Sequence, residues 1–163
     1  MILIGIDPGE STGFAVYNTE LSEFEVINTF KGFYECMLSV HAWQEYTGDI
    51  FVIVEDARLA TYKRHGKAQA ARAQGAGDVK GICREWERAL NYTGIPHRLT
   101  RPNKQLNRSA KDADNFKLLT GYVGRTSHHA RIAGKLALQE SRRMELLARE
   151  IPNRPVIPTP SNN

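Results

Sequence analysis

An apolar run that stops at a carboxylate opens the chain and constrains its fold more than any other feature. Residues 2–6 are aliphatic apart from one glycine, Asp7 follows at once, and residues 8–11 have the composition of a turn. Residues 50–54 form a second apolar run of the same kind, which ends at Glu55. Short continuous apolar runs are typical of buried strands, so we expect two strands that carry Asp7 and Glu55 to one edge of a sheet.

The composition fits one globular domain and limits the partners. The chain has 163 residues, of which 41% are hydrophobic and 25% are charged, enough to bury an ordinary core. The formal net charge of +4 weakly favours a polyanionic partner. The two cysteines, Cys36 and Cys83, fall in expected helices and indicate neither a disulfide framework nor a cysteine zinc site, which favours a reducing cytoplasm. No apolar run has the length of a membrane span or a signal-peptide core, so we expect a cytoplasmic protein without a membrane partner.

Hydrophobic periodicity predicts the order of the elements. Alternating or continuous apolar residues indicate strands, and apolar steps of three and four indicate helices. Three consecutive strands imply an antiparallel meander, whereas a buried strand that follows a helix implies parallel pairing. The expected strands are 2–7, 12–18, 23–30, 50–55 and 95–99, and the expected helices are 31–46, 67–90, 109–119 and 127–150.

This order predicts a single α/β domain over residues 1–150, with a mixed sheet and helices packed on it. Residues 100–108 are polar and basic and are expected to form a loop, after which Ser109 would cap a helix that ends before Gly121. Prolines recur throughout residues 151–163, which are therefore expected to form an extended or disordered tail.

Asp7 and Glu55 have the chemistry of ligands for a hard cation. Mg²⁺ or Mn²⁺ prefers carboxylate oxygens and also accepts oxygens of a phosphate substrate, which suits phosphodiester hydrolysis. A two-metal site of that kind calls for three or four acids, and the sequence offers only these two plainly. Two structural alternatives remain open: Asp7 as a turn-forming residue, and Glu55 as a strand end paired with an arginine.

The motifs together resemble those of RuvC-type Holliday junction resolvases, in a compact phage-like form, over about residues 1–140. The residues that carry the resemblance are Ile-Gly-Ile-Asp-Pro-Gly at 4–9 with the Thr-Gly pair at 12–13, Val-Glu at 54–55, and the segments 72–80 and 111–126. The resemblance implies the RNase H-like fold, a mixed five-stranded sheet with helices on both faces. It also implies a Mg²⁺- or Mn²⁺-dependent, structure-selective endonuclease that works as a homodimer on four-way junctions in DNA recombination or replication.

The last motif of that family departs from the pattern. The family has an acid-His-Ala-Arg-Asp-Ala sequence at the start of its final helix, where this chain has His-His-Ala-Arg-Ile-Ala at 128–133. Some family members place a histidine in this cluster, so the resemblance implies His129, or else His128, as a metal ligand or proton carrier. Ile132 takes the place of the expected aspartate and has no such chemistry.

Two further aspartates and both histidines have plainer interpretations. A histidine at a helix N-terminus is often a surface residue, and this alternative applies to both His128 and His129. Asp112 and Asp114 are candidate substitute carboxylates, or else residues on the solvated face of a polar helix.

A basic segment with one aromatic residue follows Glu55 and is the candidate DNA-contacting surface. The alternative is an ordinary solvated loop, because cations alone do not show what they face. The predicted DNA-binding residues are Arg58, Tyr62, Lys63, Arg64, Lys67 and, from a later loop, Arg125.

Two other functions are compatible with the sequence. The missing acids favour a catalytically degenerate protein that keeps the fold and binds branched DNA, or a host protein, without cleaving. Residues 7–13 also resemble the phosphate-binding turn of actin-like kinases, but that architecture needs two such lobes and the chain is too short to supply both.

Overall fold

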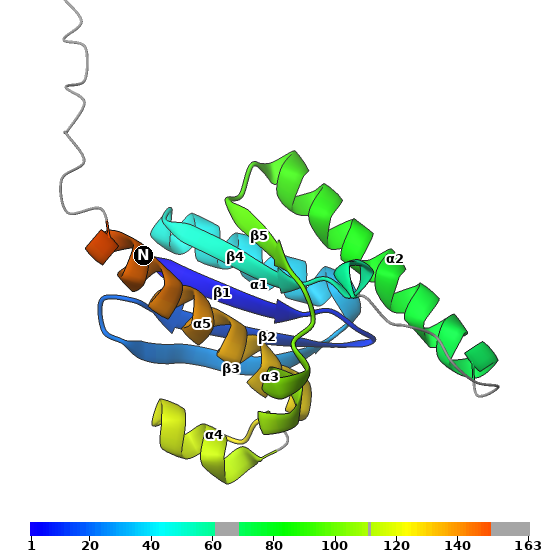
Figure 1. The fold of residues 1–163 in the computed structure, drawn as a ribbon. Helices are drawn as coiled ribbons and strands as arrows, with labels where there is room; N and C mark the ends of the chain where they lie inside the picture. Colours follow the sequence, from blue (N-terminus) through cyan, green and yellow to red (C-terminus); the bar gives the residue numbers. More distant parts are fainter. Residues whose placement is uncertain (61–68, 111, 151–163) are drawn as a thin grey trace, which may run out of the picture.

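A five-stranded mixed sheet lies at the centre of the computed structural model, which describes residues 1–60, 69–110 and 112–150. The strand order is β3-β2-β1-β4-β5 (Figure 1). The first three strands form the predicted antiparallel meander, and β4 and β5 run parallel to β1. The strands are β1 (Ile2–Asp7), β2 (Ser11–Asn18), β3 (Glu23–Lys31), β4 (Ile50–Glu55) and β5 (His97–Thr100).

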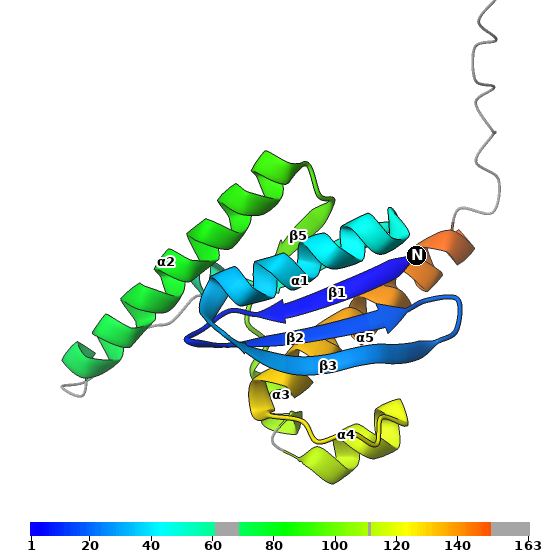
Figure 2. The same ribbon diagram turned by 180° about the vertical axis from the view of Figure 1, so that it is seen from behind.

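Helices cover both faces of the sheet, as predicted. One face carries α1 (Gly32–Thr47) and α2 (Gln69–Thr93), and the other carries α5 (His128–Glu150) (Figures 1 and 2). The short helices α3 (Lys104–Ser109) and α4 (Ala113–Thr120) lie between β5 and α5, and a single 3-10 turn, η1 (Ala57–Leu59), follows β4.

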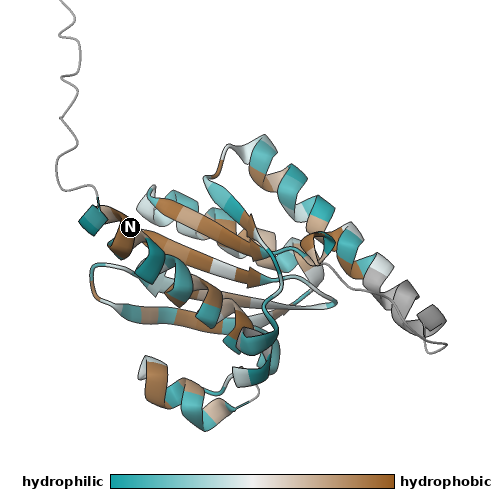
Figure 3. Ribbon diagram, viewed as in Figure 1, coloured by the Kyte–Doolittle hydropathy of each residue, from teal (hydrophilic) through white to brown (hydrophobic). Residues whose placement is uncertain are grey.

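The two faces of β1 contribute to two separate apolar cores. Ile4 belongs to the core under α1 and α2, which contains the fully buried Trp86. Leu3 belongs to the core under α5, with Ile53 and Leu136. Because successive side chains of a strand alternate between faces, a strand buried on both sides is apolar at nearly every position. The hydropathy colouring shows this for β1 and β4 (Figure 3).

Two glycines let α5 lie directly against the sheet. A Cβ atom added at Gly5 would overlap the carbonyl oxygen of Ala133, and one added at Gly13 would overlap the carbonyl oxygen of His129. Only a residue without a side chain permits this approach of one backbone to another. The first turn of α5 is therefore held over the carboxyl end of β1.

The segment between β5 and α5 differs from the sequence-based prediction. Residues 104–109 are helical rather than a loop, and Ser109 ends this helix instead of capping the next one. Asp112 is the N-cap of α4, and its side chain accepts a hydrogen bond from the backbone N–H of Asn115 at 2.9 Å. Serine and aspartate are both good N-caps, so local pattern alone did not distinguish them. Gly121 ends α4 in the left-handed conformation, as its position predicted.

None of the helices in the described part of the chain is long and apolar enough to cross a membrane. The proline-rich tail, residues 151–163, lies outside the described residues, and its predicted extended or disordered state stays a prediction.

Candidate active site

The parallel pairing of β1 and β4 brings the two predicted carboxylates together. Ile6 pairs with Val54, so the next position on each strand, Asp7 and Glu55, falls at the same sheet edge. Neighbouring strands lie about 4.8 Å apart. Alternate residues of a strand share a face, so Asp7 lies on the same face as Leu3, and Glu55 on the same face as Ile53. Leu3 and Ile53 both pack under α5, so both carboxylates point to the α5 face of the sheet. Both residues are buried, Asp7 at 6% exposure and Glu55 at 8%.

His129 in the first turn of α5 joins this edge. Its Nδ1 atom lies 2.7 Å from Oδ2 of Asp7, while nearly half of its side chain remains exposed. The hydrogen bond with Asp7 raises the pKa of His129; burial opposes the increase, and the negative charges of Asp7 and Glu55 add to it. The influence of Glu55 places all three side chains in one electrostatic environment.

The donor set fits one divalent cation better than two. Asp7 and Glu55 provide buried carboxylate oxygens at adjacent strand ends, and Mg²⁺ is commonly held by one or two carboxylates together with substrate phosphate and water. Within residues 1–60, 69–110 and 112–150, no cluster of three or more His, Cys, Asp or Glu side chains is arranged to hold a metal ion. A second ion would need further acids.

Ile132 lies on the same face of the sheet as the two carboxylates but supplies no metal-binding group there. It is 3% exposed and packs in the apolar core with Ile53 and Leu136. His128 is partly buried, with its ring 5.7 Å from that of His129. Asp112 caps α4 and Asp114 is exposed in the first turn of the same helix, which agrees with their plainer interpretation.

Arg58, a predicted DNA contact, takes part in a clamp between η1 and α2. Its Nη2 atom lies 2.6 Å from Asp56 and its Nη1 atom 2.7 Å from Glu87. Burial alone would raise the pKa of Asp56, but the hydrogen bonds and the charge of Arg58 outweigh it and the pKa is lowered. This cluster was not predicted, although the spacing of Asp56 and Arg58 around a tight turn is a signal for it in the sequence.

The other predicted DNA contacts are only partly described by the structure. Arg125 is exposed in the segment that precedes α5. The guanidinium Nε of Arg101 donates to the carbonyl oxygen of Leu59 at 3.0 Å, at the start of the basic segment. Tyr62, Lys63, Arg64 and Lys67 lie outside the described residues.

Buried charges on α5 were also missed by sequence reasoning. Arg131 and Lys135 are 8% and 9% exposed, and Glu140 is fully buried between Arg98 and Arg143. On a helix with charges in every turn, their burial depends on elements that come from elsewhere in the chain, so no local signal distinguishes them from solvated residues.

Several solved structures match this chain, among them two that contain a Holliday junction. T. thermophilus RuvC, in complex with a Holliday junction substrate, matches with a TM-score of 0.56 and 20% identity over 90% of this chain and 96% of that chain. The Fowlpox virus resolvase, in complex with its substrate Holliday junction DNA, has 12% identity and a TM-score of 0.48, over 86% of this chain and 99% of that chain. No protein-family model matches the sequence, and no curated protein matches it. The likeness to RuvC shows that the chain has the RNase H-like fold of RuvC-type Holliday junction resolvases.

Proposed function

We propose that this protein is a metal-dependent, structure-selective endonuclease that cuts phosphodiester bonds of branched DNA. The observation that carries the proposal is the convergence of Asp7, Glu55 and His129 at one sheet edge of this fold. The four-way junction is the proposed substrate because the similar RuvC structure contains one. Fold alone does not determine activity, so the proposal depends on the chemistry of these three side chains.

Each of the three side chains has a defined role in the proposed reaction. Asp7 and Glu55 would hold one Mg²⁺ or Mn²⁺ ion, which supplies Lewis-acid stabilisation of the phosphate when bound. His129 is oriented by Asp7 through Nδ1. In the neutral ring this leaves the lone pair on Nε2, which can accept a proton from the attacking water or later return one to the leaving oxygen.

The proposed assembly is a homodimer. A four-way junction has two-fold symmetry, and its resolution requires one cut in each of two opposed strands. Two copies of this chain related by that symmetry would supply the two sites. The molecular mass in solution, by sedimentation at micromolar concentration with and without a junction, tests this part; a monomer that remains monomeric on the junction contradicts it.

The second candidate function is binding of branched DNA, or of a host protein, without cleavage. The specific observation in its favour is that position 132, where the resembling family has an aspartate, holds an isoleucine packed in the core. With two carboxylates instead of three or four, the site has less capacity to activate water.

Cleavage of an end-labelled synthetic four-way junction in Mg²⁺ and in Mn²⁺ distinguishes the two candidates. The variants to compare are Asp7→Asn and Glu55→Gln, with Glu10→Gln, an exposed acid in the nearby turn, as the matched control for loss of charge. We expect paired nicks near the branch point from the wild type and Glu10→Gln, none from the other two, and no cleavage of a linear duplex. Binding without nicks in either metal would establish the non-cleaving alternative instead.

A further inference from the structure

A cavity of about 340 Å³ with mixed polar and apolar walls lies between α3, α4 and α5, on the flank of α5 beyond the candidate active site. Leu119 and Leu138 form its apolar side. We call this cavity the α5 pocket. The polar residues that line it are Asn103, Gln105, Ser109, Lys135, Gln139 and Arg142. Among the described residues that line it, none is acidic, and all six polar ones can donate hydrogen bonds.

Lys135 is a buried cation in this lining. It is 9% exposed, and its Nζ atom donates to Oγ of Ser109, which also lines the pocket, at 2.6 Å. Burial lowers the pKa of Lys135; the charge of Asp112 opposes this decrease, and the charge of Arg131 adds to it. A buried ammonium whose hydrogen-bond partner is a neutral hydroxyl is costly, and an anion in the pocket would offset that cost.

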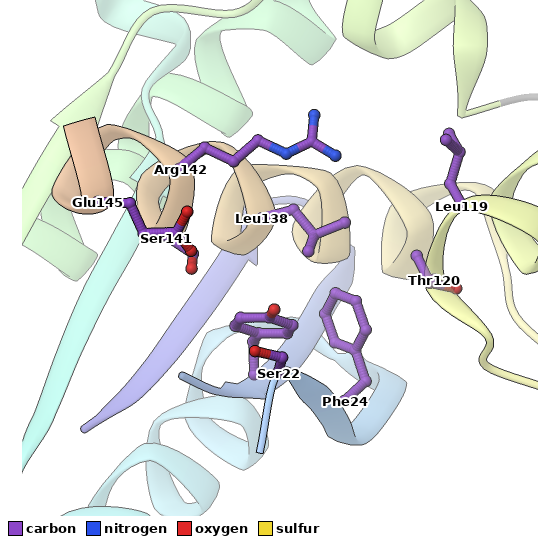
Figure 4. Close-up of a pocket in the computed structure, with 9 residues that line it drawn as sticks. Ser22, Phe24, Leu119, Thr120, Leu138, Ser141, Arg142 and Glu145 are labelled. Atoms are coloured by element: carbon purple, nitrogen blue, oxygen red, sulfur yellow. The ribbon is translucent and has the colours of Figure 1, made fainter. Parts of the chain in front are cut away.

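Arg142, about two turns after Lys135 on α5, brings a second cation to the pocket. Its side chain extends along the helix in the direction of Leu119, whereas Glu145 points away from it (Figure 4). Glu145 lines a neighbouring cavity of about 230 Å³ that shares Leu119, Leu138 and Arg142 with the α5 pocket. The acid nearest to Arg142 along the helix surface therefore does not line the α5 pocket.

We propose that the α5 pocket binds a phosphate group through Lys135, Ser109 and Arg142. A phosphate offers several strong acceptor oxygens and negative charge, which match an ammonium, a guanidinium, a hydroxyl and side-chain amides. The same donors would serve a backbone phosphate of a nucleic acid strand or a free phosphate ion, so the test must separate these two sources.

The position of the pocket favours a backbone phosphate of nucleic acid as the source. This part of the inference rests on the function proposed above. Lys135 follows His129 by six residues on α5, which corresponds to about 9 Å along the helix axis. Asn103 follows β5, whose last residue, Thr100, pairs with Glu55. A strand that leaves the candidate active site along α5 would reach the pocket after about three nucleotides of B-form rise.

The first experiment measures binding of a labelled four-way junction in EDTA, where no cleavage occurs, at several salt concentrations. The variants are Lys135→Met, which keeps the length of the side chain, and Arg142→Gln at an exposed position, with Arg149→Gln at the end of α5 as the matched control. We expect about 3- to 10-fold weaker binding for the first two, and a slope of log K against log salt that is smaller by about 0.9 for each. Arg149→Gln should change neither quantity.

The second experiment titrates the full-length protein with inorganic phosphate, against sodium chloride at equal ionic strength, and follows backbone amide chemical shifts. Saturable shifts at Ser109 and Gln139 that are absent in Lys135→Met would support the phosphate site, whether or not the wild type binds a junction. Failure of the wild type to bind a junction would contradict the proposed function and not the phosphate site. Phosphate binding with unchanged junction affinity in the variants would assign the pocket to free phosphate. No saturable shift and unchanged junction binding in both variants would overturn the proposal, and circular dichroism confirms that each variant is folded.

Discussion

Nδ1 of His129 lies 2.7 Å from Oδ2 of Asp7, although the two residues are 122 positions apart in the chain. The contact exists because Gly5 and Gly13 let the backbone of α5 rest on β1 and β2. The same packing places His129 in the electrostatic field of Glu55. The candidate active site is thus a property of how one helix meets one sheet.

The ion pair of Asp7 and His129 predicts a measurable pH dependence. Asp7→Asn should move the pKa of His129 down toward its ordinary value of 6.5, because the hydrogen bond to a charged acceptor is lost. The folded-state pKa lies above 6.5, so the stabilising contribution is fully present below that pH and is lost as pH rises through the folded-state value. NMR titration of the imidazole in metal-free buffer measures the shift, with Glu10→Gln as control. An unchanged titration in Asp7→Asn would show that the pair does not form in solution.

The close approach of α5 to the sheet predicts a sharp difference between two glycines. Gly13→Ala should destabilise the protein by about 3 kcal/mol or more, since the new Cβ overlaps the carbonyl of His129. Gly81→Ala in α2, where the space is open, should instead stabilise by about 0.5–1 kcal/mol through higher helix propensity. Urea unfolding measures both. Equal stabilities for the two variants would mean that α5 lies farther from β2 than described.

Position 132 tests whether the site can be completed. Ile132→Asp should lower the stability by about 3 kcal/mol in metal-free buffer, because it buries a carboxylate in an apolar cluster. If the new carboxylate joins Asp7 and Glu55, Mn²⁺ should raise its melting temperature more than that of the wild type. Ile132→Asn is the uncharged control and should show no such gain. An equal response of all three proteins would place position 132 out of reach of the metal.

Arg58 distinguishes a structural clamp from a DNA contact. Arg58→Gln should destabilise the protein by about 3 kcal/mol, because the buried carboxylate of Asp56 loses its charged partner. The lowered pKa of Asp56 means that this contribution is present above the ordinary pKa of 3.8 and is lost as pH falls through the folded-state value. Thermal melts at pH 7 measure the loss, with the exposed Arg84→Gln on α2 as control. Unchanged stability together with weaker junction binding would favour the DNA contact.

Most of the sheet could be predicted from sequence because its central strands β1, β2 and β4 are buried on both faces. Side chains on both sides of β1 and β4 must then be apolar, and the acids that end these runs must lie at the strand ends. The adjacency of Asp7 and Glu55 was predictable for the same reason, since parallel strands align their carboxyl ends. The roles of Asp7, Glu55 and His129 in metal binding and catalysis stay predictions.

Helix α3 and the buried cations beside it could not be predicted in this way. The residues from 100 to 110 are mostly polar, and α5 holds the end of this segment through two hydrogen bonds: Arg131 donates to the carbonyl oxygen of Ala110, and Lys135 donates to Ser109. A polar residue in a charged helix has the same local pattern whether it faces water or a distant segment. The difference lies in the partner, which is more than 20 residues away along the chain.

The sequence by itself therefore determined the strands, their order along the chain and the carboxylates at their ends, because hydrophobic periodicity is a local property that burial on the sheet imposes directly. Only the tertiary structure decided that His129 meets Asp7, that Ile132 packs in the core, and that Lys135 lines a cavity in which none of the described lining residues is acidic. Each of these depends on how closely and in what rotation α5 packs on the sheet, which long-range contacts set and no local pattern encodes.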